Sequence, residues 1–355
     1  MNLDRIHKTL SEAYSAEDYP VCLSQARQWS DTKPFRGLTI LDATPIFRNT
    51  MVKYLALLAG GAELILGHRP YGYSCDGKIL HLLRESGIEI VSATEPQSRE
   101  ADFILDCAAS FSHWKARLGY VELTRSGVPV YEGQGKKVFV ADGGRIKKIE
   151  TCLGTGVGYF RAMAQLGYND WKDRRLVVFG SGKVGTGLIT YAYKYGADIT
   201  VVTKAGGITP SVRQMVRRVI DCEDIQAVAA SVADAYAVVT ATGIAGALDH
   251  PVLTKALTDS PALLANMGVE DEYGPGLPAS RVLEHKNTFN FILEEPTQLR
   301  YIDATMGLHN EGALHLLEHP AATGVINPPA PLEDCLLELT RRHGCISEEL
   351  DMINN

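Results

Sequence analysis

Short apolar runs alternate with segments of helical periodicity in the first part of the chain. Residues 48–60 and 75–87 carry the spacing of amphipathic helices, and a further helix is expected after residue 109. Residues 128–133 and 137–144 are interpreted as a short strand pair that closes this unit. Strands that alternate with helices predict a parallel sheet with helices on both faces. The predicted strands are 38–45, 62–66, 88–93 and 101–109.

The same alternation restarts after a helix predicted over 150–167, and two helical segments, 306–320 and 331–344, follow it. The predicted strands of this second series lie within 174–182, 197–203, 235–243, 262–268 and 289–295. We therefore predict an α/β fold with two doubly wound parallel-sheet domains, the second a Rossmann dinucleotide-binding domain. The predicted parts are a substrate-binding domain (1–150), a Rossmann NAD(P)-binding domain (151–305) and C-terminal helices that return to the first domain or the hinge (306–355).

The composition narrows the class of protein. A chain of 355 residues favours two domains, and 45% hydrophobic with 22% charged residues is typical of a soluble globular protein. With a net charge of −7 and no block of Lys or Arg, nucleic acid is not an expected partner. No apolar run approaches the roughly 18 residues of a membrane span, and the polar N-terminus lacks the apolar segment of a secretion signal.

Cysteine and histidine usage bears on compartment and metal content. The seven cysteines are dispersed without a C-x-x-C pair, and the ten histidines form no H-E-x-x-H motif. This pattern is typical of reduced thiols in the cytoplasm, and we expect no metal. The partners that we expect are a small-molecule substrate and further copies of the chain, in a homodimer or a larger homo-oligomer.

A glycine-rich turn follows the apolar run LVVF. Gly180, Gly182 and Gly185 have the G-x-G-x-x-G spacing of a dinucleotide site. Gly180 permits the tight turn, Gly182 lets the backbone approach a pyrophosphate, and Gly185 lets helix and strand pack closely. The N–H groups at the start of the helix then bind the anion. We predict that Ser181, Lys183 and Val184 also contact the cofactor; the alternative is a glycine-rich turn without a ligand.

The residues after the next strand favour NADP over NAD. An NAD site has Asp or Glu there, which accepts a hydrogen bond from the ribose 2′-hydroxyl. This chain has Thr203 and Lys204 instead. A hydroxyl and an ammonium group suit a 2′-phosphate. The alternative is that Lys204 is a solvated loop lysine.

The order of motifs resembles that of S-adenosylhomocysteine hydrolases over roughly residues 38–320. The motifs that carry the resemblance are GSGKVGTG (180–187), ATG (241–243), NMGV (266–269), MGLH (306–309), GAEL (61–64), ILDCAAS (104–110) and VELTRSGV (121–128). The resemblance implies a doubly wound substrate domain that precedes an NAD-binding Rossmann domain. It also implies cofactor contacts from Thr124, Thr242, Gly243, Asn266 and Met267.

The chain departs from this family at its proton-transfer positions. The family's residues there are replaced by Pro45, Ile146, Thr155, Val269 and Leu308, with His309 next to the last of them. Pro, Ile and Val carry no group that can transfer a proton. The C-terminal segment 345–355 also lacks the family's Lys and Tyr. We therefore expect no hydrolysis of S-adenosylhomocysteine.

Asp106 stands at the end of a predicted strand in the first domain, where ligands collect in open α/β sheets. Glu122 lies in the segment 122–126, which resembles the family's loop that touches ribose and nicotinamide. Asp106 and Glu122 are the predicted catalytic acids. Alternatively, Asp106 caps a helix that begins near Ser110, and Glu122 is a solvated loop acid.

Two further residues are predicted to act in catalysis. Lys148 could polarise a carbonyl or imine, unless it belongs to a solvated charged run. His309, in a glycine-flanked turn assigned to the cofactor domain, could relay a proton beside the nicotinamide; alternatively it begins a helix over 310–318.

Arg48, Asn49 and Glu150 are predicted to bind substrate. Arg48 could hold a substrate carboxylate with two hydrogen bonds. Alternatively, Arg48 is a surface arginine without a role in binding. Glu150 lies where the family keeps a hinge-side acid.

These residues leave more than one function open. The first is an NAD(P)-dependent oxidoreductase acting on a small polar metabolite, such as an amino-acid-like or nucleoside-like carbonyl, imine or alcohol. The second is a catalytically inert homologue that binds nucleotide and regulates a partner. An altered hydrolase of the adenosylhomocysteinase type is the third.

Overall fold

The computed structural model describes residues 1–70, 75–97 and 99–353. The last two residues of the C-terminal segment thus lie outside the described residues. The chain divides into two compact units. Unit 1 comprises Met1–Ile149 and Gln298–Leu350, and unit 2 comprises Glu150–Thr297 and the described residues from Asp351 on.

Unit 1 is built on a seven-stranded parallel sheet of order β12-β6-β5-β4-β1-β2-β3. Strand order reverses between β1 and β4, which makes this pair the topological switch point of the sheet. The strands are β1 (Thr39–Asp42), β2 (Glu63–His68), β3 (Glu89–Ser92), β4 (Ala101–Asp106), β5 (Ala116–Glu122), β6 (Val138–Val140) and β12 (Val325–Ile326).

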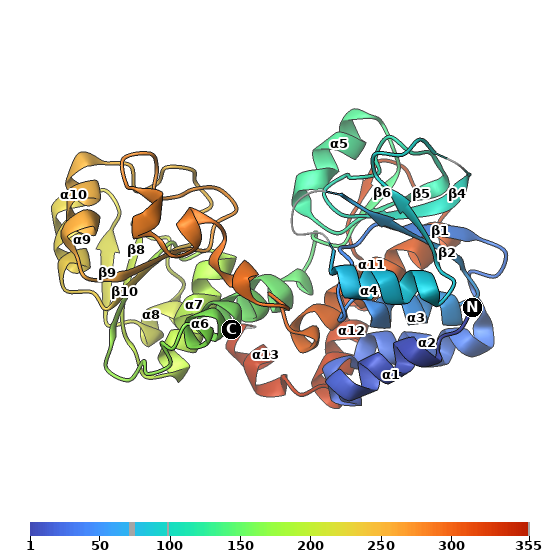
Figure 1. Cartoon of the computed structure of the whole chain (residues 1–355), viewed down its shortest axis with the longest axis horizontal. Coiled ribbons are helices and arrows are strands. Elements are labelled where there is room, and N and C mark those ends of the chain that lie inside the picture. Colours follow the sequence, from blue (N-terminus) through green and yellow to red (C-terminus); the bar gives the residue numbers. More distant parts are fainter. Residues whose placement is uncertain (71–74, 98, 354–355) are drawn as a thin grey trace. The chain divides into compact units, whose positions relative to one another are not determined.

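Helices cover the sheet of unit 1, whose parts are blue, cyan and red in Figure 1. The long helix α11 packs against β4, β5 and β6 and against α2, α3 and α12. The core residues Phe111, Trp114 and Tyr131 are buried in one cluster with the strands. The helices are α1 (Asp4–Ala13), α2 (Pro20–Thr32), α3 (Met51–Ala59), α4 (Gly77–Glu85), α5 (Val128–Gly133), α11 (Leu299–Glu318), α12 (Ala330–His343) and α13 (Ser347–Ile353).

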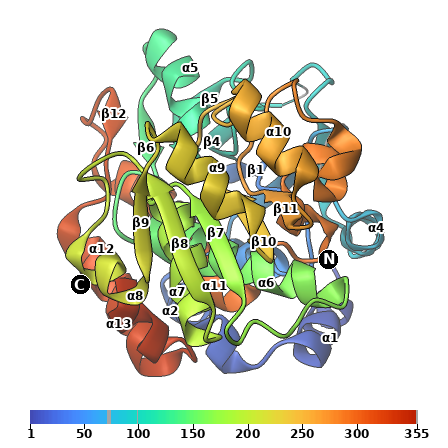
Figure 2. The same cartoon turned by 90° about the vertical axis from the view of Figure 1, so that its left-hand side faces the viewer.

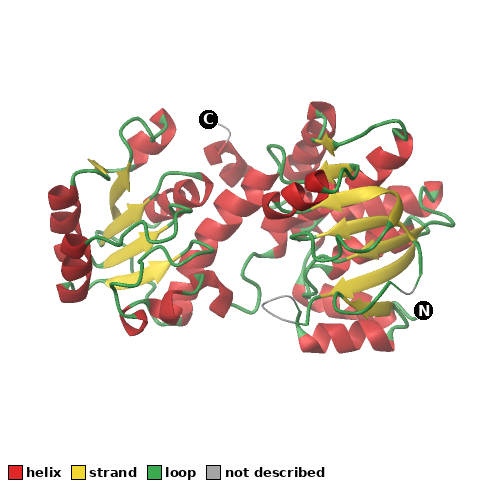
Figure 3. Cartoon of the chain, turned by 90° about the horizontal axis from the view of Figure 1, so that it is seen from above, coloured by secondary structure: helices red, strands yellow, loops and turns green. Residues whose placement is uncertain are grey.

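Unit 2 contains a five-stranded parallel sheet of order β11-β10-β7-β8-β9. Figure 2 shows β9, β8 and β7 side by side, and Figure 3 shows helices beside the strands of each unit. This order is that of a Rossmann fold, with its switch point between β7 and β10. The strands are β7 (Arg175–Phe179), β8 (Asp198–Thr203), β9 (Arg218–Asp221), β10 (Ala237–Thr240) and β11 (Leu263–Asn266).

Helix α7 (Lys183–Lys194) follows β7 directly and packs against α6 (Thr155–Gln165). Gly156 of α6 and Gly187 of α7 permit this close contact, because a Cβ at Gly156 would overlap the backbone of Gly187. The other helices of unit 2 are the π-helical turn η3 (Ile149–Gly154), α8 (Pro210–Met215), α9 (Ile225–Ala233), α10 (Pro251–Asp259) and the 3₁₀ turns η4 (Ala279–Arg281), η5 (Leu283–Lys286) and η6 (Phe289–Ile292).

The predicted fold class is confirmed, since both units are α/β with parallel sheets. Three predicted segments are wrong. Residues 128–133 form the helix α5, because Pro129 suits the first helical turn, where its missing N–H is not needed. Residues 289–292 form a 3₁₀ turn that packs on α6, not a strand. The chain turns after β4 without a helix and enters β5.

The division of the chain also differs from the predicted boundary between 305 and 306. That boundary falls inside α11, which is one continuous helix. The whole helix therefore belongs to unit 1, together with α12. None of the described helices is both long and apolar enough to cross a membrane.

Candidate functional site

The glycine turn between β7 and α7 has the geometry that a bound pyrophosphate requires. Gly180 has a φ of 96°, a left-handed conformation that side chains rarely adopt. A Cβ at Gly185 would overlap the carbonyl oxygen of Gly180. A Cβ at Gly182, by contrast, would meet nothing within 4 Å. The turn therefore leaves open space beside Gly182, at the first N–H groups of α7.

A cavity of about 610 Å³ opens beside this turn. It lies at the switch point between β7 and β10, where ligands bind in open α/β sheets. Its lining is Phe179, Gly180, Ser181, Gly182, Val202, Thr203, Lys204, Cys222, Ile225, Val228, Ala241, Thr242, Ile244, Ala247, Leu248, Asp249, His250 and Leu253. Apolar walls with a few polar groups suit a nucleoside.

The end of β8 contributes a hydroxyl and an ammonium group to this cavity. Thr203 Oγ1 lies 2.8 Å from Ser181 Oγ, which donates to the carbonyl oxygen of Gly207. Lys204 is exposed, and among the described lining residues it is the only lysine or arginine. Among the described lining residues of the cavity, Asp249 is the only carboxylate, and it lies farther along the chain.

The loops after β10 and β11 are tied to each other. Glu272 is completely buried and accepts hydrogen bonds from the backbone N–H groups of Thr242 and Gly243. The Asn266 amide donates to three carbonyl oxygens and accepts from Thr240 Oγ1 and from the N–H of Gly268. Asn266 thus holds loops in place, and its side chain is already hydrogen-bonded within the protein.

The other predicted cofactor contacts are spread over both units. Lys183 is exposed at the first position of α7, and Val184 is half-buried beside it. Met267 is buried. Thr124 belongs to unit 1, where its hydroxyl donates to Glu122 and lies 3.0 Å from Ser126 Oγ.

Fold and site define unit 2 as a Rossmann domain with a cavity beside its glycine turn. A protein-family model described as "Putative NAD(P)-binding" matches residues 168–265, which supports a nicotinamide dinucleotide as its ligand. The sequence matches no curated protein.

Two solved structures resemble the chain over most of its length. One is dipicolinate synthase A from Bacillus halodurans, with a TM-score of 0.52, 12% identity, and coverage of 81% of this chain and 100% of that chain. Another is a transhydrogenase from Sinorhizobium meliloti, with a TM-score of 0.49, 15% identity, and coverage of 81% and 97%. At 12% identity, the likeness to dipicolinate synthase A establishes a shared fold alone. The likeness to the transhydrogenase is too weak to add to this.

Asp106 and Glu122 are paired across β4 and β5 in unit 1, and both are completely buried. Glu122 accepts from the N–H groups of Ala108 and Ala109, whose φ values of 56° and 53° are left-handed. Asp106 accepts from the N–H groups of Cys107 and Phe111 and from a tyrosine hydroxyl. The two carboxylates therefore hold a strained loop, and Glu122 is not a solvated acid.

The burial of Asp106 has a consequence for stability. Loss of hydration, and secondly the nearby Glu122 carboxylate, raise the pKa of Asp106 to about 7. The unfolded chain loses this proton near pH 4 and the folded chain near pH 7. Stability that depends on Asp106 is thus fully present below pH 4 and is lost as the pH rises to 7.

We expect Asp106→Asn to flatten this pH dependence. Between pH 5 and pH 8 the variant should gain about 3 kcal/mol of unfolding free energy relative to the wild type. Urea unfolding by tryptophan fluorescence measures it in a Trp171→Phe background, because Trp29 and Trp114 both lie in unit 1. The control is Glu132→Gln, which changes an exposed acid of the same unit. The expectation is contradicted if the unfolding free energies of Asp106→Asn and the wild type change with pH in parallel.

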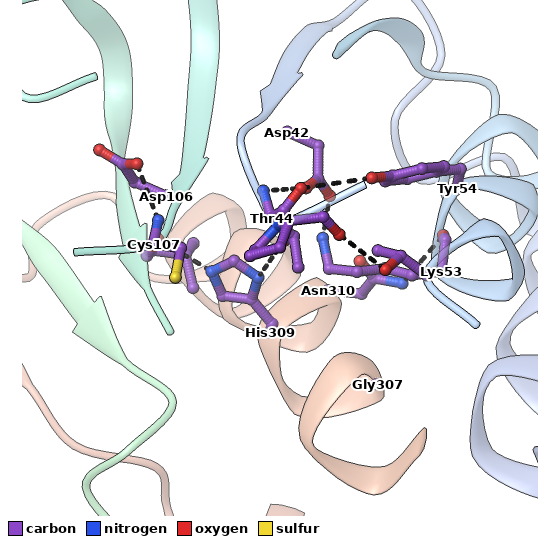
Figure 4. A network of polar contacts seen from close by, with 12 residues as sticks. Asp42, Thr44, Lys53, Tyr54, Asp106, Cys107, Gly307, His309 and Asn310 are labelled. Carbon is purple, nitrogen blue, oxygen red and sulfur yellow. Dashed lines mark hydrogen bonds and ion pairs between the residues drawn. The ribbon is translucent and has the colours of Figure 1, made fainter. Parts of the chain in front are cut away.

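The structure corrects the prediction for His309. This residue lies inside α11 in unit 1, not in a turn of the Rossmann domain and not at the start of a helix. Its buried ring places Nδ1 3.5 Å from Thr44 Oγ1 (Figure 4). Its Nε2 lies 3.0 Å from the carbonyl oxygen of Val121. Burial lowers the pKa of His309 well below its usual value. The neighbouring Gly307 permits close packing on Val21 and does not mark a turn.

Lysines other than the predicted one are buried in unit 1. Lys148 is exposed. Lys147 is buried, with its Nζ donating to the carbonyl oxygen of Leu123 at 3.2 Å. Lys53 forms a completely buried ion pair with Asp42 (Figure 4). The sequence already indicates that Lys53 is unusual, because it is the only charged residue in the apolar helix α3.

The predicted substrate-binding residues are divided between the two units. Arg48 is half-buried, and its Nε donates to the hydroxyl of Tyr14 at 3.3 Å. Asn49 is buried next to it. Glu150 belongs to unit 2, where its carbonyl oxygen accepts from Thr155 Oγ1. Substrate contacts by these three residues stay predictions.

Proposed function

We propose that the protein is an NAD(P)-dependent oxidoreductase that acts on a small polar metabolite. The observation that carries the proposal is the open space beside Gly182, at the start of α7 and next to a cavity of about 610 Å³. A nicotinamide dinucleotide bound there accepts or supplies a hydride. The chain binds the pyrophosphate through backbone N–H groups and encloses the adenosine between apolar walls.

The proposed substrate region is the carboxyl edge of the sheet of unit 1, at the switch point between β1 and β4. The strained loop after β4 lies at this edge, held by Asp106 and Glu122. Strained backbone of this kind is concentrated at functional sites. An amino-acid-like or nucleoside-like carbonyl, imine or alcohol would suit the hydride chemistry.

A second function is favoured by a specific observation. Asp106, Glu122 and His309 are completely buried and are hydrogen-bonded within unit 1. Side chains held in this way are better suited to a structural role than to proton transfer. A nucleotide-binding homologue without catalysis, acting on a partner, is therefore the alternative. An altered hydrolase is disfavoured, because Val269 is 92% exposed and offers no proton-transfer group.

Absorbance at 340 nm separates oxidoreductase from inert homologue. The protein is mixed with NADPH or NADH and pools of 2-oxo acids, imines and nucleoside-derived carbonyls. Substrate-dependent loss of absorbance, abolished in a variant that no longer binds cofactor, supports the enzyme. Tight cofactor binding without turnover in every pool, in both directions of reaction, favours the regulatory homologue.

The cofactor preference is tested at Lys204. We expect the wild type to bind NADP(H) more tightly than NAD(H), and Lys204→Ala to weaken NADPH binding about tenfold while leaving NADH binding unchanged. One lost ion pair with a phosphate costs on the order of 1.4 kcal/mol, which is tenfold. Calorimetric titration measures both, with the exposed Lys172→Ala as the control. Equal or tighter NADH binding by the wild type would contradict the preference.

A further inference from the structure

Glu272 is a buried carboxylate beneath the cofactor cavity of unit 2. It has no solvent exposure, and it follows β11 by six residues. Its two oxygens accept hydrogen bonds from consecutive backbone N–H groups, at 2.8 Å from Thr242 and 2.7 Å from Gly243. These donors belong to the loop after β10, and Ala241 and Thr242 line the cavity. One buried side chain thus fixes the orientation of two successive peptide groups.

The orientation of these peptides decides which atoms the loop presents. In a trans peptide the N–H and the C=O point in opposite directions. The carbonyl oxygens of Ala241 and Thr242 therefore point away from Glu272. The first of them lies beside the glycine turn, because a Cβ at Gly180 would overlap it. In the described part of the chain, neither oxygen accepts a hydrogen bond from the protein.

The start of α7 and the loop 241–243 consequently offer opposite chemistry. The start of α7, beside Gly182, offers N–H donors, which suit phosphate oxygens. The loop 241–243 offers carbonyl acceptors, which repel phosphate oxygens and accept from a hydroxyl or an amide N–H. A dinucleotide carries both kinds of group, with donors on its riboses and on its carboxamide.

We infer that Glu272 is a positioning residue that makes the loop 241–243 recognise a hydrogen-bond donor of the cofactor, from a ribose hydroxyl or the nicotinamide carboxamide. The inference rests on the proposed function, since it requires that a dinucleotide binds in this cavity. Glu272 itself does not touch the cofactor, because it is completely buried. It acts through the peptide groups of Thr242 and Gly243.

Glu272→Gln tests this assignment with little change in volume. A glutamine can accept from only one of the two N–H groups, and its own NH₂ then faces the other donor. The side chain has no room to turn away, since even a Cβ at Gly268 would overlap the carboxylate. The peptide that loses its acceptor is free to rotate, and its carbonyl oxygen leaves the cavity. We expect the dinucleotide to bind at least tenfold more weakly.

Three ligands show which donor is recognised, each compared between wild type and Glu272→Gln by calorimetry. Weaker binding of the dinucleotide alone identifies the carboxamide. Weaker binding of the dinucleotide and ADP-ribose, but not ADP, identifies the ribose on the nicotinamide side. Weaker binding of all three, ADP included, identifies the adenosine ribose. Each of these results supports the inference.

Control variants separate this effect from charge and folding. Glu270→Gln makes the same change of charge at an exposed position two residues away, and it should bind all three ligands like the wild type. Thermal unfolding shows whether Glu272→Gln is folded. If Glu272→Gln is not folded, the test uses the wild type alone. Its binding of the parent cofactor is compared with its binding of analogues that lack one donor, namely the acetylpyridine dinucleotide and deoxyribose dinucleotides. One of them should bind at least tenfold more weakly.

The outcomes distinguish this inference from the proposed function. If the wild type binds no nicotinamide dinucleotide, the proposed function fails and the inference fails with it. If the wild type binds, and a folded Glu272→Gln binds every ligand within twofold of it, only the inference is overturned. It is also overturned if every analogue binds the wild type as tightly as the parent cofactor.

Discussion

Gly182→Val should weaken dinucleotide binding about 100-fold while leaving the protein folded. The backbone of Gly182 has φ −69° and ψ −163°, which valine can adopt, and a Cβ there meets no protein atom within 4 Å. The added methyl groups instead fill the space in which a pyrophosphate approaches the first N–H groups of α7. A loss of 100-fold corresponds to about 2.7 kcal/mol of binding free energy.

Calorimetric titration with NADPH and NADH measures this loss, and thermal unfolding shows whether the variant is folded. Gly77→Val is the matched control, because a Cβ at Gly77 also meets nothing within 4 Å but lies in unit 1. Gly185→Val differs from both, since its side chain would overlap the backbone of Gly180 and should lower the unfolding temperature as well. If Gly182→Val binds either cofactor within threefold of the wild type, the pyrophosphate does not lie over this turn.

The parts of this site that the sequence predicted are local in the chain. Gly180, Gly182 and Gly185 lie within six positions. Steric contacts explain Gly180 and Gly185, and the pattern already implies the open space at Gly182. The alternation of strands and helices is local too, because each element shows its own periodicity. The confirmed fold class rests on these short-range signals.

The parts that the sequence did not predict depend on contacts between distant residues. Glu272 bonds to Thr242 and Gly243, thirty and twenty-nine positions away. His309 lies beside Thr44 across more than half of the chain. No local pattern indicates such pairs. A glycine close to a polar residue, such as Gly307 near His309, occurs in turns and in closely packed helices alike, so the sequence did not place His309 in a helix.

The strands β9 and β5 illustrate the same limit. β9 (Arg218–Asp221) is an edge strand with charged ends, and the second residue of β5 is the exposed Arg117, so neither forms a long apolar run. Pairing with their neighbours, β8 and β4, makes them strands. Tertiary contacts of this kind override weak local preference.

The buried pair of Lys53 and Asp42 leads to the largest expected effect on stability. Both side chains are completely buried, and burial lowers the pKa of Lys53 well below its usual value. Asp42 also accepts from the N–H of Thr44 at 2.9 Å, so the pair joins α3 to the end of β1. We expect Lys53→Met to lower the unfolding free energy of unit 1 by about 3–5 kcal/mol, because it leaves a buried carboxylate without its cation.

The double variant Asp42→Asn with Lys53→Met should recover most of this loss. Asparagine removes the charge but keeps an oxygen that can accept from the N–H of Thr44. Replacing both charges of a buried pair costs far less than removing one, since the stranded charge is the expensive part. Urea unfolding in the Trp171→Phe background follows unit 1 in the single and double variants. If the double variant is as unstable as Lys53→Met alone, the cost comes from lost lysine packing, and the ion pair does not anchor α3 to the sheet.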